Sequence, residues 1–200
     1  MLAIVLAAGV GRRFGGAKAA APLAGRPLVL HALDAARAAG IGRTIVVVGH
    51  DASTVAACVE DEPDVEVVVN EDHAQGQATS VQAGLQTAES YEDARIAVIL
   101  LGDQPHVSPV AIRQVVAALE DGGEVARASY DDGPGHPVAL ARRVWSRLVE
   151  DLRGDQGARQ LMDELEVAHV LVAGSMPPDV DRPEDLDRLA SAEGDDEGQG

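Results

Sequence analysis

The sequence predicts an α/β fold, a three-layer sandwich in which helices cover both faces of a mainly parallel sheet. Short apolar runs rich in Val, Ile and Leu alternate with longer helical segments. Such runs are typical of strands that are buried on both faces. Strands that alternate with helices form right-handed βαβ units, which build one parallel sheet. The 200 residues suit one domain, predicted at 1–190, with an acidic tail at 191–200.

The first half of the chain shows this alternation most clearly. Apolar runs predict strands at Leu2–Leu6, Thr44–Val48, Glu66–Val69 and Ile96–Leu101. The segments between them predict helices at Leu28–Ala39, Ala52–Glu60 and Gln77–Ala88. Gly40 directly follows the first of these helices and is placed to end it.

The second half begins with a helix after Ser108, because Ser is a favoured N-cap and Pro109 suits the first helical position. The strands predicted after it are Glu124–Tyr130, Pro137–Leu140 and Ala168–Val172, and the first two flank the loop DDGPGH. The predicted helices are Arg142–Asp151, Gln156–Leu165 and Pro183–Ala190. The tail SAEGDDEGQG has almost no apolar surface to bury, so disorder is expected there.

The composition argues against several classes of protein. The formal net charge is −17, from 33 acidic and 16 basic residues, so a nucleic-acid backbone or an anionic membrane surface would be repelled. Cys58 is the only cysteine, which leaves no internal disulfide and no thiolate metal site. The start MLAIVLAAG lacks the pattern of a signal peptide, and no apolar run approaches the ~20 residues that span a bilayer. We therefore expect a cytoplasmic protein without nucleic-acid or membrane partners.

Three segments that contain candidate binding or catalytic residues follow predicted strands, at 7–18, 70–80 and 102–106. In an open parallel sheet, ligands bind beyond the carboxyl ends of the strands. Because all three segments fall at such ends, we expect them to converge on one ligand crevice.

The first segment belongs to the stretch LAAGVGRRFGGAK, residues 6–18, which contains the only lysine of the chain, Lys18. Its glycines let backbone N–H groups approach a ligand closely, and Arg12, Arg13 and Lys18 add positive charge. The stretch matches neither the Walker A pattern nor the dinucleotide GxGxxG pattern. A flexible turn with solvated arginines is the alternative. The retained lysine favours a polyphosphate site, because a compact ammonium suits phosphate oxygens.

Two acidic motifs are candidates for holding a cation. In LLGDQP, Asp103 follows a buried strand and could project into the crevice to hold a hard ion such as Mg²⁺. Capping of a nearby turn is the alternative for Asp103. In DVDRPEDL, Asp179 and Asp181 lie two residues apart and could face one ion. An acidic residue before Pro-Glu-Asp is, however, also ordinary helix-start chemistry.

Taken in order, LAAGVGRRFGGAK, LLGDQP and DVDRPEDL resemble the motifs of the molybdenum-cofactor nucleotidyltransferases. QGQATSVQAGL, and GHPV followed by LRGDQGARQL, resemble the cytidylyl-transferring branch of that family. The resemblance covers nearly everything except the acidic tail. The opening motif is shared with many sugar-phosphate nucleotidyltransferases, whereas the combination of GHPV and GDQGAR is much more specific.

The resemblance implies a Rossmann-like fold and Mg²⁺-dependent transfer of CMP from CTP to the phosphate of molybdopterin, with release of pyrophosphate. It implies that Arg13 and Lys18 bind the triphosphate and act in catalysis, and that Asp103 and Asp181 hold the metal. The implied nucleotide-binding residues also include Leu6, Ala7, Ala8, Gly9, Gly11, Asn70, Gly76 and Ser80. The implied acceptor-binding residues are Gln104, His136 and Asp155.

Some positions depart from the family pattern or leave a choice open. Ala8-Gly9 stands where guanylyl-transferring relatives usually have Gly-Gly, which favours cytidine, while Phe14 and Arg182 replace a usual Met and Thr. Ser80 either contacts the base or packs against its own helix. His136 is either functional or a packing residue, and His50 and His73, which follow predicted strands, are further candidates for lining the crevice.

Three other functions remain open at this stage. They are guanylyl transfer to the same acceptor, nucleotidyl transfer to a sugar or alcohol phosphate, and a non-catalytic chaperone that carries the cofactor. A hydroxylase-type molybdoenzyme is the partner that the resemblance suggests as recipient.

Overall fold

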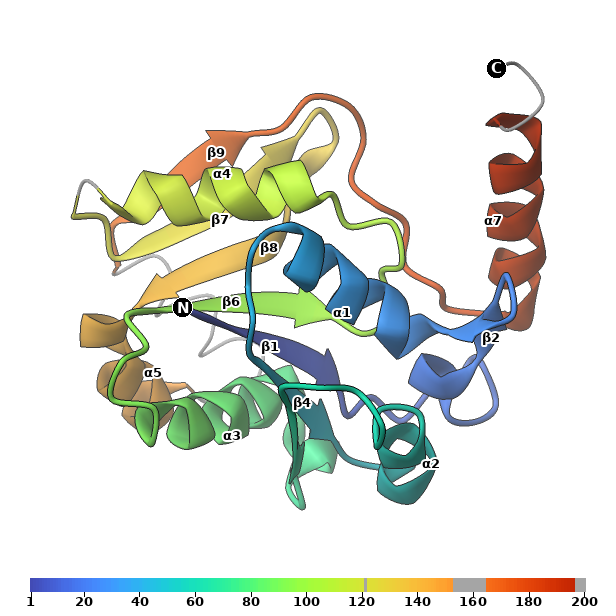
Figure 1. Cartoon of the computed structure of the whole chain (residues 1–200), viewed down its shortest axis with the longest axis horizontal. Helices are drawn as coiled ribbons and strands as arrows, with labels where there is room; N and C mark the ends of the chain where they lie inside the picture. Colours follow the sequence, from blue (N-terminus) through green and yellow to red (C-terminus); the bar gives the residue numbers. More distant parts are fainter. Residues whose placement is uncertain (121, 153–164, 197–200) are drawn as a thin grey trace.

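The computed structural model describes residues 1–120, 122–152 and 165–196, and these residues contain a seven-stranded sheet with the order β5-β4-β1-β6-β8-β7-β9 (Figure 1). Its strands are β1 (Leu2–Ala7), β4 (Thr44–Val48), β5 (Val65–Val69), β6 (Ile96–Leu101), β7 (Val125–Tyr130), β8 (Gly133–Ala141) and β9 (Val167–Leu171). All seven strands that the sequence predicts are present, with boundaries shifted by a few residues.

The sheet is mainly parallel, as predicted. The strands β5, β4, β1 and β6 run parallel to one another, and β9 runs parallel to β7. The strand β8 is the exception, because it is antiparallel to both of its neighbours, β6 and β7. Its place beside β6 brings the loop DDGPGH to the same edge of the sheet as the carboxyl end of β6.

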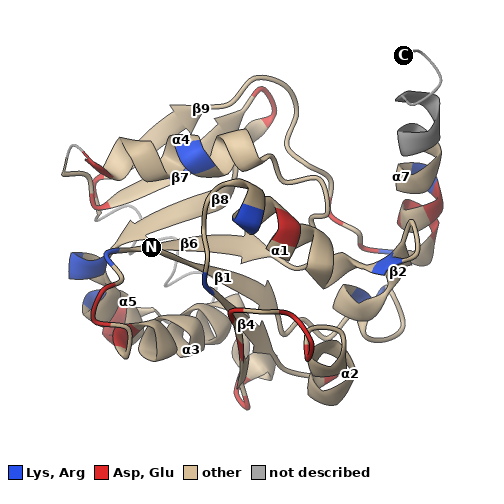
Figure 2. Cartoon of the chain, viewed as in Figure 1, with Lys and Arg blue, Asp and Glu red and all other residues tan. Residues whose placement is uncertain are grey.

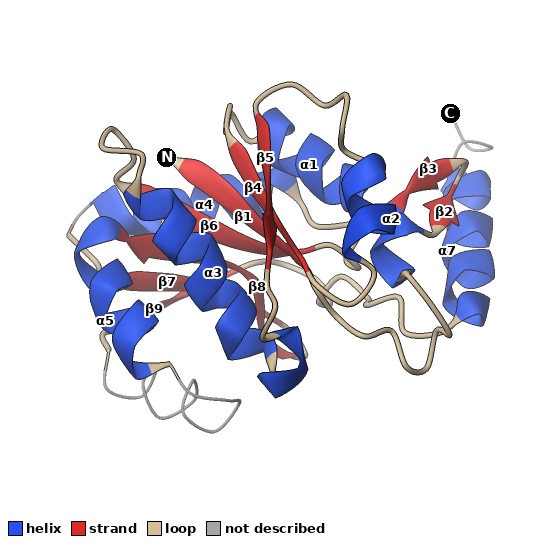
Figure 3. Cartoon of the chain, turned by 90° about the horizontal axis from the view of Figure 1, so that it is seen from below, coloured by secondary structure: helices blue, strands red, loops and turns tan. Residues whose placement is uncertain are grey.

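Helices cover both faces of this sheet (Figures 1 and 3). One face packs against α1 (Leu28–Ala38), α2 (Ala52–Ala57) and α4 (Pro109–Glu120), and the other against α3 (Gln77–Glu89) and α5 (Trp145–Asp151). Successive strand residues point to opposite faces, so Val5 and Val46 belong to the first core while Ile4 and Ile45 belong to the second. The three-layer α/β sandwich is confirmed.

Close packing of α3 on the sheet depends on Gly84. A Cβ atom at this position would lie 2.5 Å from Cγ2 of Ile4 and 3.2 Å from Cγ2 of Val47. Both neighbours are fully buried, so they cannot move aside cheaply. We expect Gly84→Val to lower the free energy of unfolding in urea by at least about 2 kcal/mol. The matched control is Gln86→Val at an exposed position of the same helix, and equal losses in the two variants would contradict the expectation.

The C-terminal helix α7 (Pro183–Asp196) lies beside a small hairpin that the sequence analysis did not predict, formed by β2 (Pro22–Leu23) and β3 (Arg26–Pro27) (Figure 1). Leu189 and Val180 pack with Leu23 and Leu28 in a separate apolar cluster. Through this cluster, the segment between the glycine-rich loop and α1 packs against the C-terminal part of the chain.

Several boundaries differ from the prediction. The helix α7 continues to Asp196, six residues into the tail that was expected to be disordered, because the helix-favouring residues Ala190 to Glu193 extend it. The helix α2 ends at Ala57 rather than Glu60, where backbone hydrogen bonds three residues apart replace the α-helical ones. The helix predicted at Gln156–Leu165 lies almost entirely outside the described residues.

The described helices include none with the length and apolar character needed to cross a bilayer. Acidic side chains are spread over the loops and over α7, whose first turn carries Glu184 and Asp185 (Figure 2).

Candidate functional site

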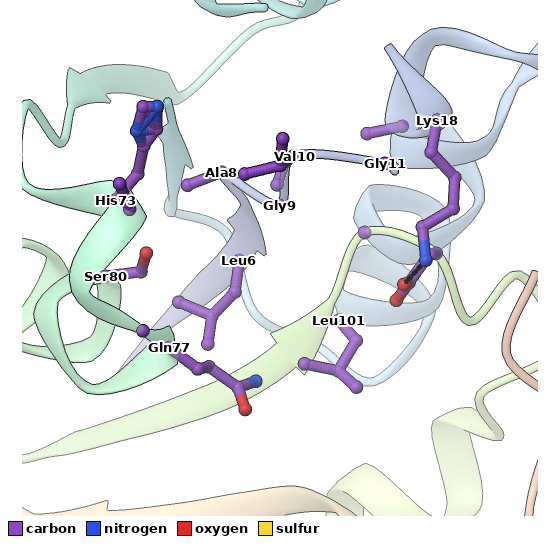
Figure 4. Close-up of a pocket in the computed structure, with 16 residues that line it drawn as sticks. Leu6, Ala8, Gly9, Val10, Gly11, Lys18, His73, Gln77, Ser80 and Leu101 are labelled. Atoms are coloured by element: carbon purple, nitrogen blue, oxygen red, sulfur yellow. Dashed lines mark ion pairs between the residues drawn. The ribbon is translucent and has the colours of Figure 1, made fainter. Parts of the chain in front are cut away.

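The three segments singled out in the sequence meet in one cleft at the carboxyl ends of the parallel strands (Figure 4). Its volume is about 460 Å³. Of the residues predicted to bind nucleotide or metal, those that line the cleft are Leu6, Ala7, Ala8, Gly9, Gly11, Lys18, Gly76, Ser80 and Asp103. Lys18 lies at one end of the cleft, and His73 and Ser80 lie at the other.

The floor of the cleft is the end of β1, held between its two neighbours. The N–H of Gly102 donates to the carbonyl of Leu6 at 3.0 Å, which joins the loop after β6 to the end of β1. Gly11 has φ +57°, and a Cβ there would collide with the carbonyl oxygen of Gly16. Only glycine fits this turn without strain. The loop therefore folds back on itself and brings Lys18, at the start of a short 3₁₀ turn, over the cleft.

Lys18 forms the centre of a charged cluster. Its Nζ lies 2.5 Å from Oδ2 of Asp103 and 3.3 Å from Oδ1 of Asp181. Arg13 reaches the other oxygen of Asp181, with Nη1 to Oδ2 at 3.1 Å. Burial alone would lower the pKa of Lys18, but the two carboxylates outweigh it and raise this pKa above its ordinary value. The ammonium therefore remains charged at neutral pH.

The segment around Asp181 is carried to the cluster by its neighbours in sequence. The N–H of Val180 donates to the backbone carbonyl of Asp103 at 3.0 Å, and the Val180 side chain is fully buried against the β2–β3 hairpin. Asp185 caps α7, because its Oδ2 accepts from the N–H groups of Asp181 and Arg182 at 2.8 and 2.9 Å. The capping of α7 is therefore done by the side chain of Asp185, and the carboxylate of Asp181 pairs with Lys18 and Arg13 instead.

Asp103 and Asp181 have the oxygen ligands that a hard divalent cation requires, and they already share one cation, the Lys18 ammonium. No group of three or more His, Cys, Asp or Glu in the described residues is arranged to hold a metal. Mg²⁺ commonly uses only one or two carboxylates together with water and substrate phosphates, so two carboxylates fit such an ion. Asp179 lies close by. Partial removal from water and the charge of Asp103 raise its pKa, against the opposing effects of Gln104 and Lys18.

The other end of the cleft is formed by the 70–80 loop and the start of α3. Asn70 is buried and does not line the cleft; its Nδ2 donates to the hydroxyls of Thr79 and Ser80 at 2.9 and 3.0 Å. Ser80 is buried as well but faces the cleft. Asn70 therefore positions Ser80 instead of lining the cleft itself.

His73 is a cleft residue that the sequence indicated only by its place at a strand end. Its ring stacks on that of His50 with centroids 5.8 Å apart. A Cβ on Gly49 would lie 2.7 Å from Cβ of His73 and 2.8 Å from Cβ of Ala8. Glycine at 49 therefore allows the loop after β5 to pack tightly on the end of β1.

Of the three predicted acceptor-binding residues, Gln104 and His136 lie in the described part of the chain. Gln104 is 2% exposed; its Nε2 donates to the carbonyl of Pro177 at 3.2 Å, while its Oε1 has no hydrogen-bond partner in the described part of the chain. His136 lies where the β7–β8 pairing shifts register, a place where strands re-aim side chains. Asp155 lies outside the described residues.

The environment of His136 changes its titration. Burial, with a smaller effect of the Arg127 charge, lowers its pKa to about 4, against a hydrogen bond with the Ile99 backbone and the charge of Asp103, which both raise it. Nδ1 of the ring is buried and has no partner among the described residues. His136 is therefore neutral at neutral pH.

This titration predicts a pH effect on stability. The unfolded chain binds a proton at His136 near pH 6.5 and the folded chain only near pH 4, so folding loses stability as pH falls through this window. Between about pH 7 and about pH 4.5, the free energy of unfolding should fall by about 2 kcal/mol more in the wild type than in His136→Gln. Parallel pH profiles from urea denaturation would contradict the assigned pKa.

Comparison with known proteins agrees with this geometry. Residues 3–170 match the MobA-like NTP transferase domain. Nicotine blue oxidoreductase of Paenarthrobacter nicotinovorans is 31% identical over 164 residues, which are 78% of this chain and 78% of that protein. The bifunctional protein GlmU of Burkholderia thailandensis is 34% identical over 172 residues, which are 84% of this chain but only 36% of GlmU.

Solved structures of a mycobacterial protein are similar over almost their whole length. Rv0371c from Mycobacterium tuberculosis H37Rv has a TM-score of 0.77 at 33% identity, covering 95% of this chain and 96% of that chain. Its complex with manganese has a TM-score of 0.76 at 32% identity and covers 96% and 98%. With a family match over most of its length and a cleft built from the three predicted segments, the chain belongs to the MobA-like NTP transferase domain family and is a nucleotidyltransferase.

Proposed function

We propose that this nucleotidyltransferase transfers CMP from CTP to the phosphate of a molybdopterin-type acceptor, with Mg²⁺ as the metal ion. The observation that carries the proposal is the position of Lys18, which reaches two carboxylates at one end of a cleft lined by backbone of the glycine-rich loop. This is an arrangement for phosphates and a divalent cation together, inside a chain whose net charge of −17 would otherwise repel both a nucleotide and an anionic acceptor.

The orientation that we propose for the nucleotide follows from the charged groups at one end of the cleft. We assign the triphosphate to the end with Lys18 and Arg13, and the base to the end with Ser80 and His73. The Ala8–Gly9 backbone lies between them. Ala8-Gly9, where guanylyl-transferring relatives usually have Gly-Gly, supports cytosine as the base.

A divalent ion fits Asp103 and Asp181, and the manganese complex of Rv0371c supports the use of such an ion by a relative. When bound, Mg²⁺ would supply charge neutralisation at the phosphoryl oxygens. If Asp103 and Asp181 held this ion, they would release Lys18, and its ammonium would be free to turn to the phosphates. Lys18 would then exchange carboxylate partners for phosphate partners without leaving the cleft.

The chain itself needs to supply no strong general base. The second pKa of a phosphate monoester is about 6, so the acceptor phosphate is largely a dianion at neutral pH. One of its oxygens forms a bond to the α-phosphorus of CTP while the bond from that phosphorus to the α–β bridging oxygen breaks. The electron pair leaves with pyrophosphate, whose charge Arg13 and Lys18 stabilise. The product would pass to a hydroxylase-type molybdoenzyme.

A panel of nucleotides and acceptors tests the proposal. Purified protein is incubated with CTP, GTP, ATP or UTP, with Mg²⁺ or Mn²⁺, and with molybdopterin, molybdenum cofactor or a sugar phosphate, and pyrophosphate release is measured. Release with CTP and a pterin acceptor is the expected result. Release only with GTP would assign guanylyl transfer, and release only with the sugar phosphate would assign the sugar-phosphate branch. Tight binding of the pterin without pyrophosphate release from any nucleotide would identify a carrier protein instead.

A further inference from the structure

Arg127 is a cation on one face of the second half of the sheet. It lies on β7, is half-buried, and donates from Nε to the carbonyl of Gly135 and from one terminal nitrogen to that of Pro134, both at 3.2 Å. Within the described residues its guanidinium forms no ion pair with a carboxylate. Burial lowers the pKa of Arg127, yet an arginine stays protonated in proteins. Among the described residues, this partly buried positive charge therefore has no carboxylate partner, although the chain is strongly acidic.

The sheet register places Arg127 on the face that the cleft opens to. Arg127 is paired with Val138 of β8, and Val138 is paired with Ile99 of β6. Paired residues point to the same face, and Val138 and Ile99 belong to the core beneath α3 and α5. Leu6, which lines the cleft, belongs to the same core. Arg127 and the cleft floor therefore share one face of the sheet.

The hydrogen bonds of Arg127 link it to His136, because its guanidinium donates to the carbonyls of Pro134 and Gly135, the two residues directly before that histidine. The Arg127 guanidinium lowers the pKa of His136 and the Asp103 carboxylate raises it, so both charges act on this one ring. Asp103 in turn contacts Lys18. His136 is therefore near both Asp103 and Arg127, and the two cations come from different elements, Lys18 from the glycine-rich loop and Arg127 from the β7–β8 hairpin.

Phosphoryl transfer between two anionic substrates requires cations on both sides of the reacting phosphorus. The attacking and leaving oxygens lie roughly in line on opposite sides of the phosphorus. If pyrophosphate leaves toward Lys18 and Arg13, an anionic acceptor must approach from the opposite side, where acidic groups would otherwise repel it. A guanidinium with free N–H groups matches a phosphate in geometry as well as in charge.

We propose that Arg127 binds the phosphate group of the acceptor, which is therefore a phosphomonoester held on the hairpin side of Asp103. This inference rests on the proposed nucleotidyl transfer, and it adds the residue that binds the phosphate of the acceptor. Next to Arg127, the hydroxyl of Ser129 lies 3.0 Å from Nδ1 of His169, and both residues share its face of the sheet by strand alternation and register. These groups supply hydrogen bonds for the remainder of the acceptor.

The test compares Arg127→Gln with Arg113→Gln, which removes the same charge from an exposed position on α4 whose guanidinium also contacts a backbone carbonyl. Pyrophosphate release is measured with CTP, Mg²⁺ and varied molybdopterin. Arg127→Gln should raise KM for molybdopterin at least about tenfold and leave KM for CTP within about twofold. Arg113→Gln should change neither. Arg127→Lys should recover part of the loss, because it keeps the charge without the planar fork.

Binding provides a second readout that does not depend on turnover. Calorimetry follows molybdopterin, with and without its phosphate, binding to protein saturated with a non-hydrolysable CTP analogue and Mg²⁺. Removing the phosphate should weaken binding to the wild type but not to Arg127→Gln, and unchanged affinity for the analogue shows that the variant is folded. Equal phosphate dependence in both proteins, or an unchanged KM in an active Arg127→Gln, would overturn the inference. Phosphate-dependent binding without turnover would instead overturn only the proposed function, and absence of molybdopterin binding by the wild type would overturn both.

Discussion

Replacing Lys18 by alanine is expected to lower turnover at saturating CTP by at least about 10²-fold, a loss of about 2.7 kcal/mol of transition-state stabilisation. Lys18 is the only lysine of the chain, and its ammonium is the cation held closest to Asp103. Its removal leaves the departing pyrophosphate without that charge, takes from Asp103 its cation partner, and leaves Asp181 paired with Arg13 alone. Pyrophosphate release under saturating substrates measures the effect.

Two further variants sharpen this result. Arg26→Ala removes a cation that pairs with Asp34 outside the cleft, so it controls for the change in net charge and should retain wild-type turnover. Lys18→Arg keeps the charge but substitutes a planar, larger group, and we expect it to recover little activity. A Lys18→Ala protein as active as the Arg26→Ala control would remove Lys18 from the proposed site.

Asp103→Ala is the second change with a large expected effect. We expect a loss of at least about 10²-fold in turnover, together with a higher Mg²⁺ concentration for half-maximal rate. The variant also leaves the Lys18 ammonium, whose side chain is only 16% exposed, with Asp181 as its remaining carboxylate. Pyrophosphate release is titrated with Mg²⁺, and then with Mn²⁺ after removal of metal by a chelator.

The matched control for Asp103→Ala is Asp93→Ala, which breaks an exposed ion pair with Arg43 far from the cleft. It should keep both the turnover and the metal dependence of the wild type. If Asp103→Ala also kept the wild-type Mg²⁺ dependence, its carboxylate would not be a metal ligand, even if turnover fell.

Much of the fold could be predicted from local patterns. Strands β1, β4 and β6 are buried on both faces, so their sequences are continuous apolar runs that stand out from the rest. The parallel topology then placed the loops after them at one edge, which is why Lys18, Ser80 and Asp103 could be expected to meet. That expectation about their meeting in one cleft is confirmed; their roles in binding and catalysis remain predictions.

Other features depend on contacts between distant residues, which no local pattern encodes. The β2–β3 hairpin has strands of two residues and owes its place to Leu23 packing against Val180 and Leu189. The choice of Asp185 over Asp181 as the cap of α7 could not be made from an acid-rich motif in which several residues fit the same role. Arg127 was missed because it sits alone in an otherwise ordinary strand and its contacts arise from the irregular pairing of β7 and β8.

The reversed direction of β8 has a consequence for how such enzymes diversify. Because β8 runs antiparallel to β6, its N-terminal end lies at the edge of the sheet where the parallel strands have their carboxyl ends. The β7–β8 hairpin therefore forms its own part of this edge. The hairpin is bonded through Asp131 and Asp132 to the backbone of Gly174 and Met176, and it belongs to a different part of the chain from the glycine-rich loop. A library confined to 131–136 should therefore alter which second substrate is accepted while the first is retained.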